Sequence, residues 1–230
     1  MKSVLVTGGT VRLGKAIAEH LRAEGWRVIT SSHRADAGAD IVADLAEPMG
    51  AAKLYAAAMK LLGGTPPDAL VSNAALFTGD EAAIRAVNLE APKKLTVMMA
   101  GREAGIGAAV NILDSVVLGS LGSVESEATL NDADPTLNDL KRPYLASKRE
   151  LAAFTRSSAA MFAATLRVNG VAPGPVLAPT DVHAKAGETL LDRRPTPDDV
   201  AAAVSYLLSA ESTTGAIIPV DAGQHLISEK

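Results

Sequence analysis

A tyrosine and a lysine four residues apart are the strongest candidates for chemistry in this chain of 230 residues. Tyr144 and Lys148 follow Pro143 in a helical pattern over residues 144–163, so both side chains share one helix face. Proline is favoured in the first position of a helix, which predicts a start at Pro143. An ammonium beside a phenol favours phenolate, so we expect Lys148 to lower the pKa of Tyr144 toward neutrality and make it a proton donor. Tyr and Lys four residues apart are also common on helix surfaces, so the spacing alone does not identify a catalytic pair.

A glycine-rich turn follows the first apolar run of the chain. Gly8 and Gly9 follow the apolar residues 4–6, and Gly14 lies at the start of a helical pattern that ends at Gly25. Glycines there let the backbone approach a pyrophosphate, whose charge meets the free N–H groups of the following helix. A tight strand-to-helix connection gives the same pattern, so the turn alone is a weak signal of a dinucleotide site.

The residues after the second apolar run indicate which dinucleotide is bound. An NAD site has an acidic residue about 20 residues after the glycine turn, where this chain reads Ser31-Ser32-His33-Arg34. Arg34, with Arg12 and the serine hydroxyls, suits the 2′-phosphate of NADPH, because guanidinium groups bind phosphate through paired hydrogen bonds. We therefore expect NADPH in preference to NADH. The alternative is that Arg34 is a solvated surface residue.

Short apolar strands alternate with helical patterns along the chain. This alternation predicts an α/β fold, a doubly wound parallel sheet with helices on both faces, as a single domain over residues 1–230. The predicted strands lie at residues 4–6, 27–30, 41–43, 69–71, 108–113, 167–171 and 216–220, and the predicted helices at 13–24, 48–62, 80–100, 144–163 and 197–210. Residues 115–142 lack periodicity and are predicted to be a long irregular insert, which is usually functional or mobile.

Composition restricts the class of protein. With 48% hydrophobic and 21% charged residues, the chain can bury a core. Its net charge of -4, without a basic run, argues against nucleic-acid and membrane surfaces. The absence of cysteine excludes disulfides and cysteine-ligated metals, and no metal site is predicted. We expect a cytoplasmic protein without a membrane span, whose partners are small molecules or copies of itself.

A series of ordered landmarks resembles the short-chain dehydrogenase/reductase family over nearly the whole chain. They are Thr7-Gly8-x3-Arg12-x-Gly14, Asp44, Asn73-Ala74, Asn88, Tyr144-x3-Lys148, Pro173-Gly174 and the segment from Thr214-Gly215 to Val220-Asp221. The resemblance implies that Tyr144 is the proton donor, that Lys148 holds the nicotinamide ribose, and that Asn88 supports a proton-relay water.

The same resemblance assigns the cofactor contacts. It implies that Asp44 contacts the adenine, that Asn73 and Ala74 line the cofactor, and that the backbone at Pro173 and Gly174 lies near the carboxamide. The expected contacts are Gly8, Thr10, Arg12, Leu13, Gly14, Ser32, His33, Arg34, Asp44, Leu45, Asn73, Ala74, Ala75, Tyr144, Lys148, Pro173, Gly174 and Val176.

Departures from the common family pattern resemble one subgroup, the pteridine reductases. Arg12 stands where the family has a middle glycine, and Asp114 stands where it has a catalytic serine; His33-Arg34 and Phe77 match the subgroup too. The likeness implies a pterin ring between the nicotinamide and Phe77, with Arg12 near the pyrophosphate and the pterin. Asp114 could assist protonation of a ring nitrogen. We therefore expect reduction of a dihydropterin or dihydrofolate C=N bond.

Other interpretations remain open. A small register shift would give the serine role to Ser115 beside Tyr144, which is typical of an NADPH-dependent reductase of 3-oxoacyl thioesters or small ketones. Phe77 could be a core residue. A third hypothesis is a non-catalytic NADPH-binding sensor or scaffold, whose acidic insert, with residues such as Glu125 and Glu127, contacts a protein partner.

Three features of the chain depart from the pteridine reductase pattern. Ala75 replaces a serine that is usual in the subgroup, the interval from Asp114 to Tyr144 is enlarged, and the loop after Gly174 lacks polar landmarks.

The family resemblance also suggests a homotetramer or homodimer built from helices 80–100 and 144–163.

Overall fold

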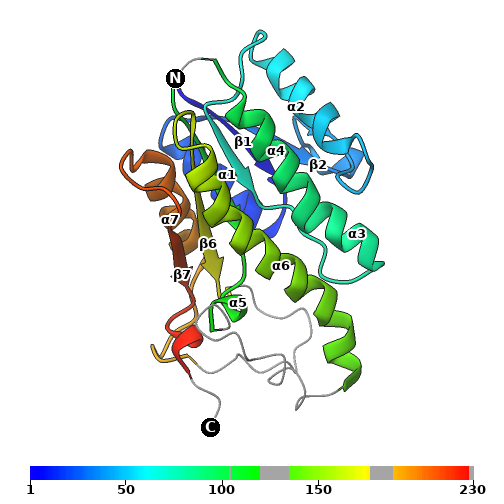
Figure 1. Ribbon diagram of the computed structural model, residues 1–230, viewed down its shortest axis with the longest axis vertical. Coiled ribbons are helices and arrows are strands. Elements are labelled where there is room, and N and C mark those ends of the chain that lie inside the picture. The colour runs from blue at the N-terminus through cyan, green and yellow to red at the C-terminus, as the bar shows by residue number, and fades with distance from the viewer. Residues whose placement is uncertain (104, 120–134, 177–188, 228–230) are drawn as a thin grey trace.

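The sheet of this protein has seven strands, all parallel, in the order β3-β2-β1-β4-β5-β6-β7 (Figure 1). The computed structural model describes residues 1–103, 105–119, 135–176 and 189–227. The strands are β1 (Ser3–Thr7), β2 (Arg27–Ser32), β3 (Ile41–Val42), β4 (Ala69–Ser72), β5 (Gly107–Ile112), β6 (Leu166–Pro173) and β7 (Ile217–Val220). The predicted doubly wound α/β fold is confirmed, and each strand lies within a few residues of its predicted place.

Helices cover both faces of the sheet. They are α1 (Arg12–Ala23), α2 (Gly50–Leu61), α3 (Glu81–Arg85), α4 (Ala91–Ala100), α5 (Val116–Gly119), α6 (Pro135–Met161) and α7 (Pro197–Ser209). A π-helical turn, Ala86–Glu90, joins α3 to α4, and short 3-10 turns lie at Ala35–Ala37 and Gln224–Leu226. The predicted helix over residues 80–100 therefore consists of three consecutive helical segments.

Alternate residues of the central strands build two separate cores. In β1, Val4 and Val6 pack with α1 and α7 on one face, whereas Leu5 packs with α2 and α4 on the other. All three side chains are fully buried. A parallel sheet that is covered on both faces needs such continuous apolar strands, which is why they were readable in the sequence.

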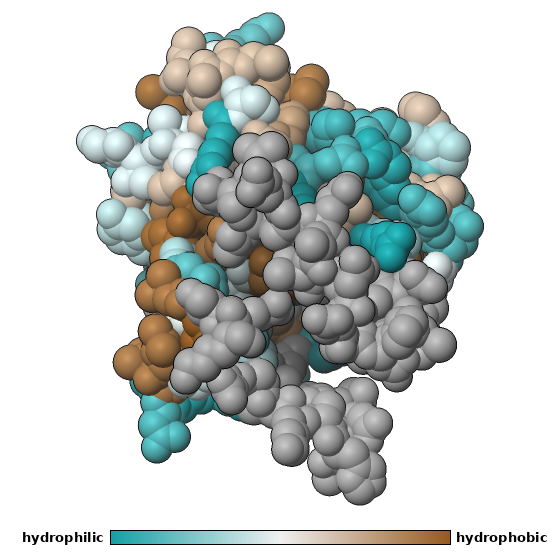
Figure 2. All heavy atoms as spheres, turned by 60° about the horizontal axis from the view of Figure 1, so that its bottom comes forward, coloured by the Kyte–Doolittle hydropathy of each residue, from teal (hydrophilic) through white to brown (hydrophobic). Residues whose placement is uncertain are grey.

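The strand order reverses between β1 and β4, which creates a crevice at the carboxyl ends of these strands. The loops after β1, β4, β5 and β6 meet at this end of the sheet, at the bottom of Figure 1. Figure 2 looks toward this end, where apolar residues gather on the left and hydrophilic residues on the right.

The helix that carries Tyr144 and Lys148 begins earlier than predicted. It starts at Pro135, so Pro143 lies inside α6 and not at its first turn. Proline inside a helix removes one backbone hydrogen bond, which is why the sequence indicated a start there. The insert at 115–142 is therefore partly helical, since it includes α5 and the first residues of α6, while residues 120–134 lie outside the described part.

In the part of the chain that the structure describes, no helix is long and apolar enough to span a membrane.

Candidate active site

The turn after β1 has the shape that an anion-binding turn needs. Gly8 adopts a φ of 63°, and a Cβ atom at Gly14 would lie 2.1 Å from the carbonyl oxygen of Gly8, so only glycine fits there. The first turn of α1 has no acidic residue. The residue before it, Val11, makes no side-chain hydrogen bond to the backbone N–H groups of this turn. The N–H groups and the positive end of the α1 dipole therefore suit a pyrophosphate.

Arg12 begins α1 with a φ of 50°, one of only two positive values among the non-glycine residues that the structure describes. This left-handed conformation is the one that glycine adopts at little cost, whereas a residue with a Cβ is strained. Arginine therefore occupies a position whose backbone favours glycine. Strain of this kind tends to persist at functional sites.

Asn73 and Thr7 fix the turn to the neighbouring strand. The Asn73 side-chain amide donates to the carbonyl oxygens of Thr7 at 3.0 Å and Gly8 at 3.2 Å. In return, the Thr7 hydroxyl accepts the backbone N–H groups of Asn73 at 2.9 Å and Ala74 at 3.0 Å. The β1 and β4 loops are thus held together where the crevice opens.

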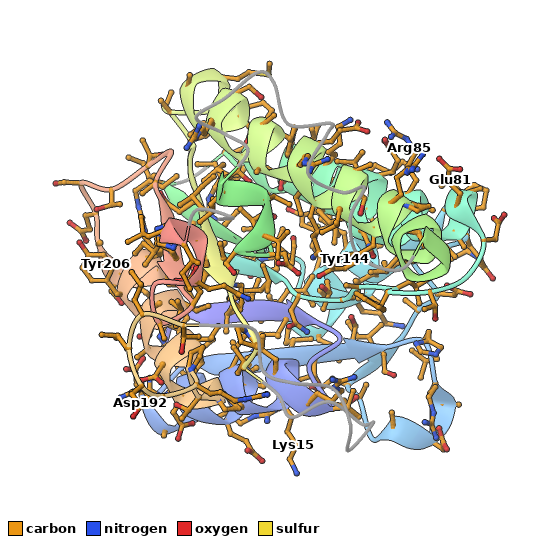
Figure 3. All side chains as sticks on the ribbon, turned by 90° about the horizontal axis from the view of Figure 1, so that it is seen from below. Lys15, Glu81, Arg85, Tyr144, Asp192 and Tyr206 are labelled. Atoms are coloured by element: carbon orange, nitrogen blue, oxygen red, sulfur yellow. The ribbon has the colours of Figure 1, made fainter. Side chains whose placement is uncertain are left out.

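Asp114 and Tyr144 are in direct contact. The Tyr144 hydroxyl donates to Oδ2 of Asp114 at 3.0 Å, and Oδ1 of Asp114 accepts the backbone N–H of Val116 at 3.0 Å. Asp114 follows β5 and Tyr144 lies on α6, so two separate elements bring the pair together. Figure 3 shows Tyr144 near the middle of this end of the molecule, with Lys15 and Asp192 at the periphery.

Lys148 lies buried beneath this pair. Its Nζ donates to the carbonyl oxygen of Ile112 at 2.7 Å and lies 5.7 Å from the centre of the Tyr144 ring. Burial lowers the pKa of Lys148 to about 8, and the Asp114 carboxylate partly opposes this shift.

The predicted effect of Lys148 on Tyr144 is wrong for this structure. The pKa of Tyr144 is raised well above its ordinary value, first by burial and then by the charge and hydrogen bond of Asp114. The physical reason is that the phenol points to a carboxylate, while the ammonium points to a backbone carbonyl. Tyr144 is therefore held in its protonated form.

Phe77 is not a core residue. Its side chain is 49% exposed, and its ring centre lies 4.9 Å from that of Tyr144 with the planes tilted by 58°. The alternative that Phe77 serves core packing is therefore wrong. An exposed aromatic face beside a hydroxyl suits a flat ligand.

Asn88 connects the Phe77 loop to the Tyr144 helix. It is fully buried, accepts the N–H of Leu76 at 2.7 Å, and donates to the Leu76 carbonyl at 2.8 Å and to the Ser147 hydroxyl at 3.2 Å. Ser147 in turn donates to the Tyr144 carbonyl oxygen at 2.6 Å. Sequence reasoning missed Ser147, although its position between Tyr144 and Lys148 was a signal.

Ser115 contacts the turn that follows β7. It is buried, its hydroxyl lies 3.3 Å from Oε1 of Gln224, and its N–H donates to the Pro173 carbonyl at 2.9 Å. A Cβ atom at Gly174 would lie 2.6 Å from the Cβ of Asp221, so the turn after β7 packs tightly on the turn after β6. Nothing in the sequence pattern indicated Gln224.

The remaining predicted cofactor residues lie around the crevice. Arg34 forms an ion pair with Asp36, and its backbone N–H donates to the Ser32 hydroxyl at 3.1 Å. Asp44 is exposed and accepts the N–H of Ala46 at 2.8 Å, next to buried Leu45. Thr10, Leu13, His33, Ala75 and Val176 are all partly or fully exposed.

Comparisons with known proteins agree with this architecture. A family model described as enoyl-(acyl carrier protein) reductase matches residues 12–225. The ketoacyl reductase 2 of the granaticin polyketide synthase of Streptomyces violaceoruber is 30% identical over 97% of this chain and 96% of its own. The 3beta-hydroxysteroid dehydrogenase 1 of Eggerthella lenta is 30% identical over 98% of this chain and 94% of its own.

A solved structure shares the fold over the whole chain. FolM alternative dihydrofolate reductase 1 from Brucella canis, in complex with NADP, has a TM-score of 0.80 and 30% identity, covering 100% of this chain and 96% of its own. This chain therefore belongs to the short-chain dehydrogenase/reductase family of nicotinamide-dependent oxidoreductases.

Proposed function

We propose that this protein is an NADPH-dependent reductase of a dihydropterin or dihydrofolate C=N bond. The observation that carries the proposal is the contact between the Tyr144 hydroxyl and the Asp114 carboxylate, 3.0 Å apart, beside the half-exposed ring of Phe77. A ring with adjacent nitrogen donors can hydrogen-bond a carboxylate and stack on a phenyl face, whereas a simple ketone uses neither.

The glycine turn and the start of α1 would hold the pyrophosphate of NADPH, with Asn73 keeping the turn in shape. Arg34 and Arg12 would meet the phosphate charges. Brucella canis FolM, which shares 30% identity with this chain, was solved with NADP. The fit of the turn to an anion supports the same cofactor here.

Bound NADPH would supply the hydride for the carbon of the C=N bond. The chain supplies the proton for the nitrogen. Tyr144 remains protonated because its pKa is raised, so its hydroxyl is available as the donor. Asp114 would orient the nitrogen-bearing edge of the substrate, and Lys148 would hold the ribose and contribute positive charge beneath Tyr144.

A second candidate is reduction of a 3-oxoacyl thioester or small ketone. The likeness to the granaticin ketoacyl reductase favours it. In that case Ser115 would have to turn from Gln224 toward the substrate.

We also propose that the protein acts in the cytoplasm as a homodimer or homotetramer. Helices α4 and α6 lie side by side on the face that Figure 1 turns to the viewer. Val97 on α4 is 53% exposed, as expected for a residue that a second copy covers.

Steady-state turnover of NADPH tests the proposed function. The purified protein is assayed with dihydrobiopterin, dihydrofolate, small ketones and a 3-oxoacyl thioester, following the loss of NADPH absorbance. We expect the reduced pterins to be turned over with the highest kcat/KM. Higher kcat/KM for the ketones or the thioester would favour the second candidate, and NADPH binding without turnover of any substrate would favour the sensor hypothesis.

A further inference from the structure

An exposed arginine and aspartate form a two-pronged ion pair just beyond β2. Nε of Arg34 donates to Oδ1 of Asp36 at 3.0 Å, and Nη2 donates to Oδ2 at 2.6 Å. The side chains are 62% and 69% exposed. The pair lies at the carboxyl end of β2, where the ribose 2′ group of a dinucleotide is recognised in folds of this type.

The local backbone brings the two groups together. Arg34 precedes a 3-10 turn, Ala35–Ala37, which is closed by Gly38 in the left-handed conformation with a φ of 66°. The N–H of Arg34 donates to the Ser32 hydroxyl at 3.1 Å, which fixes the start of the turn to the strand. The turn therefore places the Asp36 carboxylate within hydrogen-bond distance of the Nε and Nη2 atoms of Arg34.

We propose that Asp36 is a specificity-determining residue that opposes Arg34: it weakens the binding of a cofactor 2′-phosphate and improves the binding of a free ribose 2′-hydroxyl. This inference rests on the proposed use of a nicotinamide dinucleotide and sets the balance between NADPH and NADH.

Charge is the first reason. A 2′-phosphate carries up to two negative charges and binds an arginine through the same paired geometry as a carboxylate. Asp36 already uses Nε and Nη2 of Arg34, so a phosphate must displace it or bind beside it. In either arrangement the carboxylate adds repulsion, and the pair together has no net charge.

Hydrogen bonding is the second reason. The adenine-linked ribose of NADH carries a free 2′-hydroxyl, which donates a hydrogen bond to an acidic residue in NAD-binding folds. Asp36 supplies an exposed carboxylate in this region. One exposed pair thus offers a cation to NADPH and an acceptor to NADH.

Binding constants of the wild-type protein and three variants test the inference. We would titrate NADPH and NADH into wild type, Asp36→Asn, Arg34→Ala and the double variant, following cofactor fluorescence. The matched control is Glu211→Gln, which removes the same charge from an exposed residue that lines a hollow with Lys2 and Trp26, on the amino-terminal side of the sheet.

We expect Asp36→Asn to tighten NADPH binding and to weaken NADH binding, so that the ratio of the two dissociation constants changes by about three- to tenfold. Arg34→Ala should move the ratio the other way, and the gain from Asp36→Asn should shrink in the Arg34→Ala background. Glu211→Gln should leave the ratio unchanged.

Weaker NADPH binding in Asp36→Asn would overturn the inference, because Asp36 would then orient Arg34 for the phosphate. An unchanged ratio would overturn it as well. A wild-type protein that binds neither dinucleotide would instead contradict the proposed function, so the two failures are distinguishable. A comparison of 2′-phospho-AMP with AMP in the same variants isolates the phosphate, and should give the same sign as NADPH against NADH.

Discussion

Burial of Lys148 sets the pH range over which the proposed reductase should work. Its pKa of about 8 means that the ammonium form is lost as the pH rises through this value. Tyr144 does not contribute to this change, because its pKa is raised well above its ordinary value. We therefore expect kcat/KM, which reports the free enzyme, to fall above a pH of about 8.

A variant of Asp114 tests which group is responsible. The carboxylate of Asp114 raises the pKa of Lys148, so Asp114→Asn should move the basic limb of the profile to lower pH. Phe77→Leu carries no charge change and should leave the limb where it is in wild type. A limb that stays in place in Asp114→Asn would contradict the assignment to Lys148.

Phe77 gives a second prediction at the residue scale. Its ring is half exposed and contacts Tyr144, so Phe77→Leu should raise KM for a reduced pterin about two- to tenfold through lost ring stacking. The free energy of unfolding should change by less than about 0.5 kcal/mol, because the side chain lies outside the cores. Steady-state kinetics and urea denaturation measure the two effects. A large loss of stability with an unchanged KM would contradict this prediction and indicate that Phe77 serves core packing.

At the scale of elements, the Asn88–Ser147 contact joins two separate segments of the site. The buried Asn88 amide donates to the Ser147 hydroxyl at 3.2 Å, and it also holds both backbone groups of Leu76. Ser147→Ala should leave this donor without its partner and lower the free energy of unfolding by about 1–3 kcal/mol.

The same variant should change catalysis more than binding of the cofactor. Loss of the link lets the Phe77 loop and the Tyr144 helix move relative to each other, so kcat should fall while the dissociation constant of NADPH stays near its wild-type value. Ser157→Ala is a control on the same helix, since Ser157 is exposed and its hydroxyl donates to the Phe154 carbonyl of that helix. Equal effects of both substitutions would contradict the positioning role.

The sequence predicted the elements well because the fold depends on local apolar patterns. The strand at Val4 to Val6 is apolar at every position, and its burial on both faces explains why. The start of α6 was wrong because proline usually marks a first turn, and here it lies inside the helix. The residue types around Pro143 do not show on which side of the proline the helix begins.

The site residues could be predicted only where they belong to the ordered motifs of the family. The neighbourhood of Tyr144 and Lys148 was predicted, but the direction of the Tyr144 pKa shift was not, because it depends on where the Asp114 carboxylate points. The contact of Ser115 with Gln224 joins residues 109 apart in sequence. No spacing rule connects Ser115 to Gln224, so this contact could be found only from the tertiary structure.

At the scale of the whole molecule, the proposed homo-oligomer can be tested through the exposed face of α4. Val97→Glu would bury a carboxylate in the interface between copies, so it should shift the molar mass measured by light scattering from dimer or tetramer to monomer. Leu61→Glu is a control, because Leu61 is similarly exposed at the end of α2. A wild-type protein that is monomeric at micromolar concentration would contradict the proposal.

The most direct test of the account compares the two neighbouring residues after β5. Asp114→Ala and Ser115→Ala are assayed against dihydrobiopterin and against a 3-oxoacyl thioester, with NADPH as reductant. We predict that dihydrobiopterin turnover collapses in Asp114→Ala and persists in Ser115→Ala. Thioester turnover that survives in Asp114→Ala and collapses in Ser115→Ala would contradict the account and identify a carbonyl reductase.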